Sequence, residues 1–134
     1  MGKGSTRRAA LMSIRPEYVE AIISGAKTVE FRKQRLAPDV GTVVIYATSP
    51  IKAVVGEFEI TSQVSNSPAG LWQEFKLVSG IDRRRFFEYF RGRSSGVGIL
   101  IGNVTAYAPQ KRLEDIAPGS RPPQSFRYLE DSAA

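Results

Sequence analysis

The middle of the chain holds two strand-like segments that follow each other with no helix between them. The first covers residues 42–48 (TVVIYAT) and is rich in β-branched residues, and the second covers residues 52–64 (KAVVGEFEITSQV), after a break at Ser49-Pro50. Gly56 in the second segment predicts a bend or bulge. Neighbouring parallel strands need a long crossover connection, so this order favours a small barrel over a parallel βαβ sheet.

Short helices are predicted on either side of these strands. The first begins after Arg15-Pro16 and ends at Gly25, the second begins at the N-cap Ser67, and the third begins at the N-cap Asp82. Their predicted buried stripes are Tyr18, Ala21 and Ile22; Leu71, Trp72, Phe75 and Val78; and Phe86, Phe87 and Phe90.

Further strands are predicted at residues 10–14, 27–33 and 96–108, with a turn of helix at 113–116 and an extended Pro-rich segment at 118–128. The expected fold is α+β, a small β-barrel of about five to six mostly antiparallel strands with inserted short helices. One domain is expected over residues 11–129, preceded by a disordered basic arm at 1–10 and followed by a tail at 130–134.

Histidine and cysteine are absent from the 134 residues. Their absence excludes Ser-His and Cys-His triads, disulfides and sulfur-ligated metals, so an enzyme built here depends on Lys, carboxylate, Tyr or Thr chemistry. No metal-ligand spacing stands out, and no cofactor is expected.

The formal net charge of +6 favours an anionic partner, with nucleic acid ahead of a membrane surface. No apolar run approaches the roughly 20 residues of a membrane span, and the N-terminus lacks the apolar stretch of a signal peptide, so a cytoplasmic location is expected.

The strand at residues 27–33 (KTVEFRK) carries the most suggestive charges. Its alternation places Thr28, Glu30 and Arg32 on the face opposite the two apolar residues. Lys27 is a compact cation and Arg32 a planar donor fork, and both suit phosphate. Glu30 accepts hydrogen bonds, either from a base or from Arg32. The alternative is an ordinary Glu30–Arg32 pair on a solvated strand face.

The run at residues 25–32 (GAKTVEFR) resembles the G-x-K-x-x-E-x-R signature of ASCH domains. The segments at 13–16 (SIRP), 45–50 (IYATSP) and 122–126 (PPQSF) are similar to those of bacterial stand-alone ASCH proteins labelled predicted transcriptional regulators. The resemblance implies a PUA-like barrel with a cleft facing the signature. It also implies nucleic acid or a nucleotide-like ligand as partner, with RNA preferred and DNA possible.

Whether the chain is an enzyme stays open. Some ASCH relatives are amidohydrolases of acetylated cytidine, whose threonine lies three residues after the signature lysine; Glu30 occupies that position here, and Thr28 points to the opposite strand face from Lys27. Ribonuclease activity has also been proposed for ASCH domains. In a hydrolase of either kind, Lys27 would act as base and Glu30 as its partner.

Other residues extend the predicted site. Tyr46, on one strand face with Thr48 and close to Ser49, either stacks on a base or fills the barrel. The third helix and the residues that follow it carry five arginines within a stretch of eleven residues: Arg83, Arg84, Arg85, Arg91 and Arg93. The first three are expected to contact the nucleic-acid backbone if the helix borders the cleft, and otherwise only aid solubility. The predicted binding residues are therefore Lys27, Glu30, Arg32, Tyr46, Ser49, Arg83, Arg84 and Arg85.

Overall fold

A computed structural model describes residues 7–129 of the chain. Most of the predicted basic arm and the whole 130–134 tail lie outside these residues, and the last part of the arm, from Arg8, belongs to the first strand. Among residues 7–129, no helix has both the length and the apolar character that a membrane span needs.

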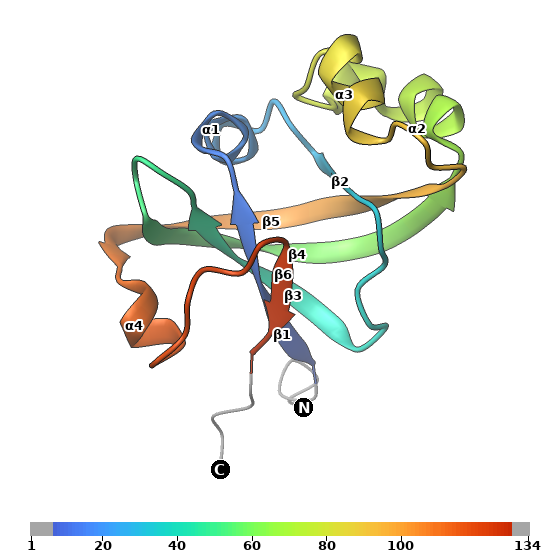
Figure 1. Ribbon diagram of the computed structural model, residues 1–134. Helices are drawn as coiled ribbons and strands as arrows, with labels where there is room; N and C mark the ends of the chain where they lie inside the picture. Colours follow the sequence, from blue (N-terminus) through green and yellow to red (C-terminus); the bar gives the residue numbers. More distant parts are fainter. Residues whose placement is uncertain (1–6, 130–134) are drawn as a thin grey trace.

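Six strands form one curled sheet, an open half-barrel (Figure 1). They are β1 (Arg8–Ile14), β2 (Val29–Arg32), β3 (Val40–Ala47), β4 (Ala53–Asn66), β5 (Gly96–Lys111) and β6 (Phe126–Tyr128). Their spatial order is β2-β5-β4-β3-β1-β6. Only the β1–β3 pair is parallel, so the prediction of a small, mostly antiparallel barrel is confirmed.

The bulge predicted at Gly56 lies in β4, where the register to β5 shifts between Val54 and Gly56. A Cβ atom on Gly56 would lie 2.5 Å from the backbone oxygen of Thr105 on β5. Only glycine therefore allows the two strands to approach this closely, and the two long strands bend as a pair.

Short helices pack against the sheet: α1 (Pro16–Ser24), α2 (Pro68–Phe75), the 3-10 helix η2 (Lys76–Val78), α3 (Arg83–Tyr89) and α4 (Leu113–Ile116). Their ends follow the local signals. Gly25 closes α1 with a φ of 89°, Ser67 accepts the Gly70 N–H, and Asp82 accepts the Arg85 N–H.

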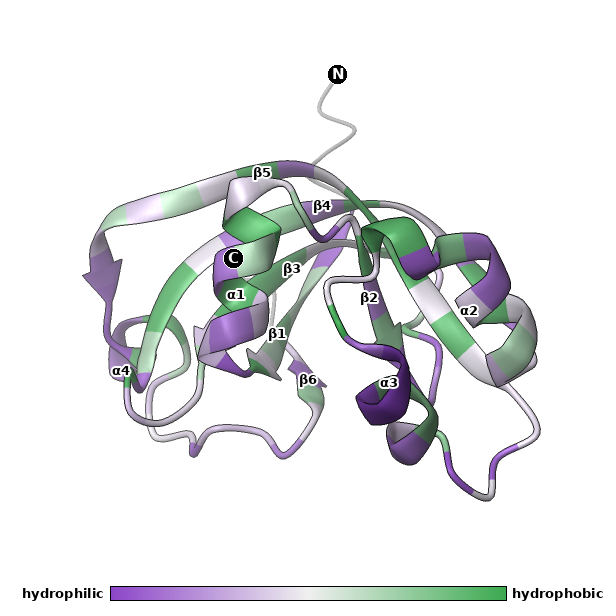
Figure 2. Cartoon of the chain, turned by 90° about the horizontal axis from the view of Figure 1, so that it is seen from above, coloured by the Kyte–Doolittle hydropathy of each residue, from purple (hydrophilic) through white to green (hydrophobic). Residues whose placement is uncertain are grey.

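The buried face of α1 differs from the prediction. Val19 and Ile22 are its buried residues, whereas Tyr18 and Ala21 are half-buried. The reason for Tyr18 is that it faces a cavity between α1 and α3, and Figures 1 and 2 show these two helices on the same side of the sheet.

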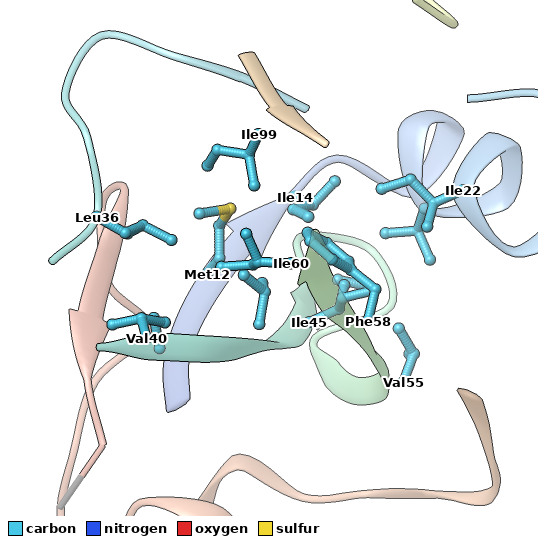
Figure 3. Close-up of a cluster of buried hydrophobic side chains, with 14 of the residues drawn as sticks. Met12, Ile14, Ile22, Leu36, Val40, Ile45, Val55, Phe58, Ile60 and Ile99 are labelled. Atoms are coloured by element: carbon cyan, nitrogen blue, oxygen red, sulfur yellow. The ribbon is translucent and has the colours of Figure 1, made fainter. Parts of the chain in front are cut away.

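Three apolar clusters hold the fold together, and two of them include residues of α1, α2 or α3. The concave side of the sheet encloses the first, which includes Met12, Ile14, Ile22, Ile45, Phe58 and Ile99 (Figure 3). The second lies under α2 and α3 and consists mainly of aromatic rings, among them Phe31, Phe75, Phe86 and Phe90, with Trp72 against it. The rings of Phe31 and Phe86 meet edge to face at 4.8 Å, a favoured aromatic geometry. The predicted stripes of α2 and α3 are thus core.

The Pro-rich segment contributes the last strand. Residues 126–128 form β6, which pairs antiparallel with β1, and the Ser13 N–H donates to the Ser125 carbonyl just before it. The segment leading to β6 therefore runs along the rim of the half-barrel, close to the end of β1.

Candidate ligand-binding pocket

A cavity of about 570 Å³ opens between α1 and α3. Its charged lining residues are Arg15, Lys27, Glu30, Arg32, Arg85 and Glu88, and its aromatic ones are Tyr18, Phe31, Phe86 and Tyr89. Ser13, Thr48 and Gln124 add neutral polar groups. Four cations face two carboxylates, so the lining is positive overall.

Lys27 lies in the wall of this cavity and is only 3% exposed. Its Nζ atom donates to the Ser79 carbonyl at 2.6 Å and lies 3.7 Å from Oε1 of Glu30. The same ammonium lies 5.4 Å and 5.3 Å from the ring centres of Tyr18 and Phe31. Burial lowers the pKa of Lys27, although the Glu30 carboxylate acts against this shift.

The loop after η2 positions the Lys27 side chain. Gly80 has a φ of 64°, and a Cβ atom there would lie 2.7 Å from Cβ of Lys27. The backbone therefore packs directly on the lysine stem, while the adjacent Ser79 carbonyl receives the ammonium. A side chain at position 80 would displace one or the other.

Glu30 joins the two cations of the signature. Its Oε2 atom accepts hydrogen bonds from Nε and Nη2 of Arg32 at 3.0 Å and 2.8 Å, and Oε1 faces Lys27. Glu30 is 6% exposed, so the alternative of a pair on a solvated strand face is wrong. Both faces of β2 are enclosed: Val29 and Phe31 pack into the aromatic cluster, and Glu30 faces the cavity.

Arg32 spans the open side of the half-barrel. Besides Glu30, it donates to the Ser13 carbonyl on β1 at 2.9 Å and to the Ser125 hydroxyl before β6 at 3.1 Å. The sequence assigned this donor fork to phosphate, but most of its donors bind protein atoms instead. Arg32 thus links the two edges of the sheet beside the pocket.

Of the three arginines at the start of α3, only one lines the pocket. Arg85 lines the pocket, where its Nη1 atom donates to Glu17 at 2.9 Å and to the Tyr18 hydroxyl at 3.3 Å. Arg83 does not line it, and its guanidinium lies 5.0 Å from the ring centre of Phe87. Arg84 is exposed and also lies outside the pocket lining.

Tyr46 and Ser49 are not brought into the pocket. Tyr46 is 6% exposed and packs with Leu11, Val44 and Val54 in a third apolar cluster, so the structure supports the barrel-filling interpretation over base stacking. Ser49 is exposed in the turn after β3. The prediction placed Tyr46 and Thr48 on the same strand face, but β3 ends at Ala47 and the alternation does not continue to Thr48. Of these two residues, only Thr48 lines the pocket.

Several pocket residues were not predicted, chiefly Tyr18, Tyr89 and Gln124. Tyr18 fitted the apolar stripe of α1, and Gln124 lies in the Pro-rich segment without any local signal. Tyr89 is 37% exposed, and burial of its phenol raises its pKa. The signal available for Tyr89 in the sequence was its position outside the predicted apolar stripe of the third helix, which consists of Phe86, Phe87 and Phe90.

Residues 7–129 contain no group of three or more acidic side chains arranged to hold a metal ion. The carboxylates of the pocket are instead paired with arginines or with Lys27.

Comparison with known proteins identifies close relatives. The ASCH domain model matches residues 12–113. An ASCH domain-containing ribonuclease from Zymomonas mobilis is 31% identical over 126 residues, which cover 92% of this chain and 85% of the relative. A crystal structure of ASCH from Zymomonas mobilis superposes with a TM-score of 0.84 at 29% identity, covering 91% of this chain and 87% of the other. A tyrosine-to-phenylalanine variant from the same organism gives 0.85 at 29% identity, with 92% and 91% covered.

Proposed function

The chain belongs to the ASCH domain family, and on that basis we propose that it binds RNA, with one nucleotide held in the pocket between α1 and α3. The observation that carries this proposal is the buried ion network at the pocket wall, formed by Lys27, Glu30 and Arg32. Two cations share one carboxylate there, which leaves a net positive charge beside the cavity. Burying Lys27 is unfavourable, as its lowered pKa indicates, and such groups concentrate at functional sites.

The size and lining of the pocket fit a nucleotide. About 570 Å³ lies within the usual range of small-ligand sites, roughly 300–1,000 Å³. Tyr18 and Tyr89 offer aromatic surface for a base, and Thr48 and Gln124 offer hydrogen bonds to its edge. RNA is preferred over DNA because the Zymomonas mobilis relative is named a ribonuclease. Roles in transcription and a cytoplasmic location stay predictions.

The test compares two neighbouring arginines. Labelled single-stranded RNA, double-stranded RNA and single-stranded DNA are titrated at two salt concentrations with the wild type, Arg85→Ala and Arg84→Ala. Both side chains are exposed on α3, but only Arg85 lines the pocket. Arg85→Ala should weaken RNA binding clearly more than Arg84→Ala. Equal losses, or no RNA binding at low salt, would contradict the proposal.

A second candidate function is RNA hydrolysis, favoured by the name of the same relative. In this reaction the ribose 2′-oxygen attacks the adjacent phosphorus, the bond from phosphorus to the 5′-oxygen breaks, and a 2′,3′-cyclic phosphate forms while the 5′-oxygen takes a proton from water. A second water molecule then opens the cyclic phosphate, which completes the hydrolysis. Lys27 is the group proposed to take the 2′-hydroxyl proton, because burial brings its pKa closer to neutrality. Glu30 would position the amine through the 3.7 Å ion pair.

Lys27→Met separates this candidate from binding alone. It removes the amine while Glu30 keeps its hydrogen bonds to Arg32, so the variant should remain folded. RNA cleavage, followed with a fluorogenic oligonucleotide, should be lost in this variant. Acetylated cytidine is tested as a second substrate, because an amidohydrolase was the other kind of hydrolase considered for Lys27 and Glu30. Cleavage that persists undiminished in Lys27→Met would exclude the proposed base.

A further inference from the structure

The mouth of the pocket is bridged by an ion pair between its two flanking helices. Nη1 of Arg85 on α3 donates to Oε2 of Glu17 on α1 at 2.9 Å and to the Tyr18 hydroxyl at 3.3 Å. The hydrogen bond from Arg85 is the main cause of the lowered pKa of Glu17, and the positive charge of Arg15, which also lines the pocket, adds to this effect. The Glu17 carboxylate therefore accepts a hydrogen bond from Arg85 and lies near the positive charge of Arg15, and both arginines line the pocket.

Glu17 is the only member of this group that does not line the pocket. Its carboxylate nevertheless holds the guanidinium that a ligand entering between α1 and α3 would meet. Carboxylate and phosphate oxygens bind arginine in the same way, through charge-assisted hydrogen bonds. The side chains of Arg85 and Glu17 are 52% and 51% exposed, so water screens the pair and a competing anion can replace Glu17 at small cost.

We propose that Glu17 occupies the position of a ligand phosphate on Arg85, so that the pocket takes a nucleotide whose phosphate lies at the mouth and displaces this carboxylate. The proposal rests on the proposed RNA binding and adds the orientation of the bound nucleotide: base toward Glu30, phosphate toward Arg85. The phosphate is either terminal or part of an RNA strand, and the experiment below distinguishes these sources.

The test uses Glu17→Gln, Arg85→Ala and their combination in the full chain. Glu20→Gln is the matched control, because Glu20 is an exposed glutamate on the same helix, whereas the ion pairs of Arg85 are with Glu17 and Asp82. Each variant is titrated by NMR with the four ribonucleoside 5′-monophosphates, with the matching nucleosides, and with an RNA trinucleotide that lacks terminal phosphates. Thermal unfolding of each variant checks that the fold is retained.

Glu17→Gln should strengthen binding of a phosphate-bearing probe about two- to fivefold, which corresponds to releasing one exposed ion pair. The gain should be absent for nucleosides, smaller in Glu20→Gln, and abolished in the Arg85→Ala background. A gain with the monophosphate alone assigns a terminal phosphate, and a gain with the trinucleotide assigns the strand.

Three results would overturn the proposal: unchanged or weaker binding of both phosphate-bearing probes by Glu17→Gln, an equal gain for nucleosides, or a gain that persists without Arg85. Failure of longer RNA to bind the wild type would instead remove the proposed function itself. If RNA binds but Glu17→Gln changes nothing, only the phosphate position is wrong.

Discussion

Glu30→Gln is expected to destabilise the protein strongly, although glutamine has nearly the shape of glutamate. The Glu30 carboxylate lies 3.7 Å from Nζ of Lys27 and 2.8 Å from Nη2 of Arg32. The cationic side chains are only 3% and 12% exposed. The substitution leaves the buried charge of Lys27 and the half-buried charge of Arg32 without their shared partner, and loss of one partner of a buried pair costs about 3–5 kcal/mol.

The free energy of unfolding that Glu30→Gln loses through Lys27 has an upper limit, because the unpaired amine can release its proton. An amine with the ordinary pKa of 10.5 releases its proton at a cost of about 1.4 kcal/mol per pH unit, hence about 5 kcal/mol at pH 7 and about 2 kcal/mol at pH 9. Burial already lowers the pKa of Lys27, and removal of Glu30 lowers it further. The folded variant therefore binds fewer protons than its unfolded chain, so its stability rises with pH until the unfolded amine also loses its proton.

Urea unfolding of wild type and variant at pH 7 and pH 9 tests this reasoning, followed by the fluorescence of Trp72, the single tryptophan. The loss of about 3–5 kcal/mol at pH 7 should shrink toward about 2 kcal/mol at pH 9. Glu59→Gln, at an exposed position on β4, is the control and should stay within about 0.5 kcal/mol of wild type. A loss below about 1 kcal/mol at pH 7, or the same loss at both pH values, would refute the argument.

Three further substitutions test the surroundings of the pocket. Gly80→Ala should cost about 1–3 kcal/mol in urea unfolding, because φ is 64° there and the new methyl would lie 2.7 Å from Cβ of Lys27; a variant as stable as wild type would contradict this. Phe86→Ala should cost about 3–5 kcal/mol and change the emission of Trp72, since Phe86 is fully buried with its ring 5.1 Å from the tryptophan; a loss under about 1 kcal/mol would be inconsistent with this packing. Asp82→Ala should cost about 1 kcal/mol in thermal unfolding because it removes the N-cap of α3, and Asp82→Asn should restore most of it; equal losses in the two variants would argue against capping.

Local signals in the sequence predicted where the helices begin and end. The N-caps Ser67 and Asp82 and the left-handed Gly25 act within one helical turn, so a few neighbouring residues suffice to recognise them. Gly56 marked the bulge for a similar reason, since glycine within a strand is costly unless another backbone approaches it.

Strand pairing was harder to predict from the sequence, because it depends on contacts between residues that are far apart in the chain. Nothing near residues 8–14 indicates that β1 runs parallel to β3, and the Pro-rich segment gave no sign that residues 126–128 would pair with β1. β5 also continues to Lys111, beyond the predicted end at residue 108, because β4 pairs with it over this length.

The candidate site shows where alternation fails as a guide. A period of two separates the faces of β2 correctly, but it does not show that the second face is also covered. Glu30 is buried there because Lys27 and Arg32 compensate its charge, and this compensation depends on tertiary contacts. Tyr18 and Gln124 reach the same cavity from segments far apart in the chain, so no local pattern connects them.

The link from Arg32 to the segment before β6 has a consequence for protein synthesis. Arg32 and Ser125 are separated by 93 positions, and Ser13 and Pro123 by 110. A nascent chain still holding residues 123–125 inside the ribosome has the signature strand but neither the bond that anchors Arg32 nor the Gln124 wall of the cavity. The pocket is therefore completed only after this segment emerges, so a ribosome-bound chain stalled before that point has an incomplete pocket wall.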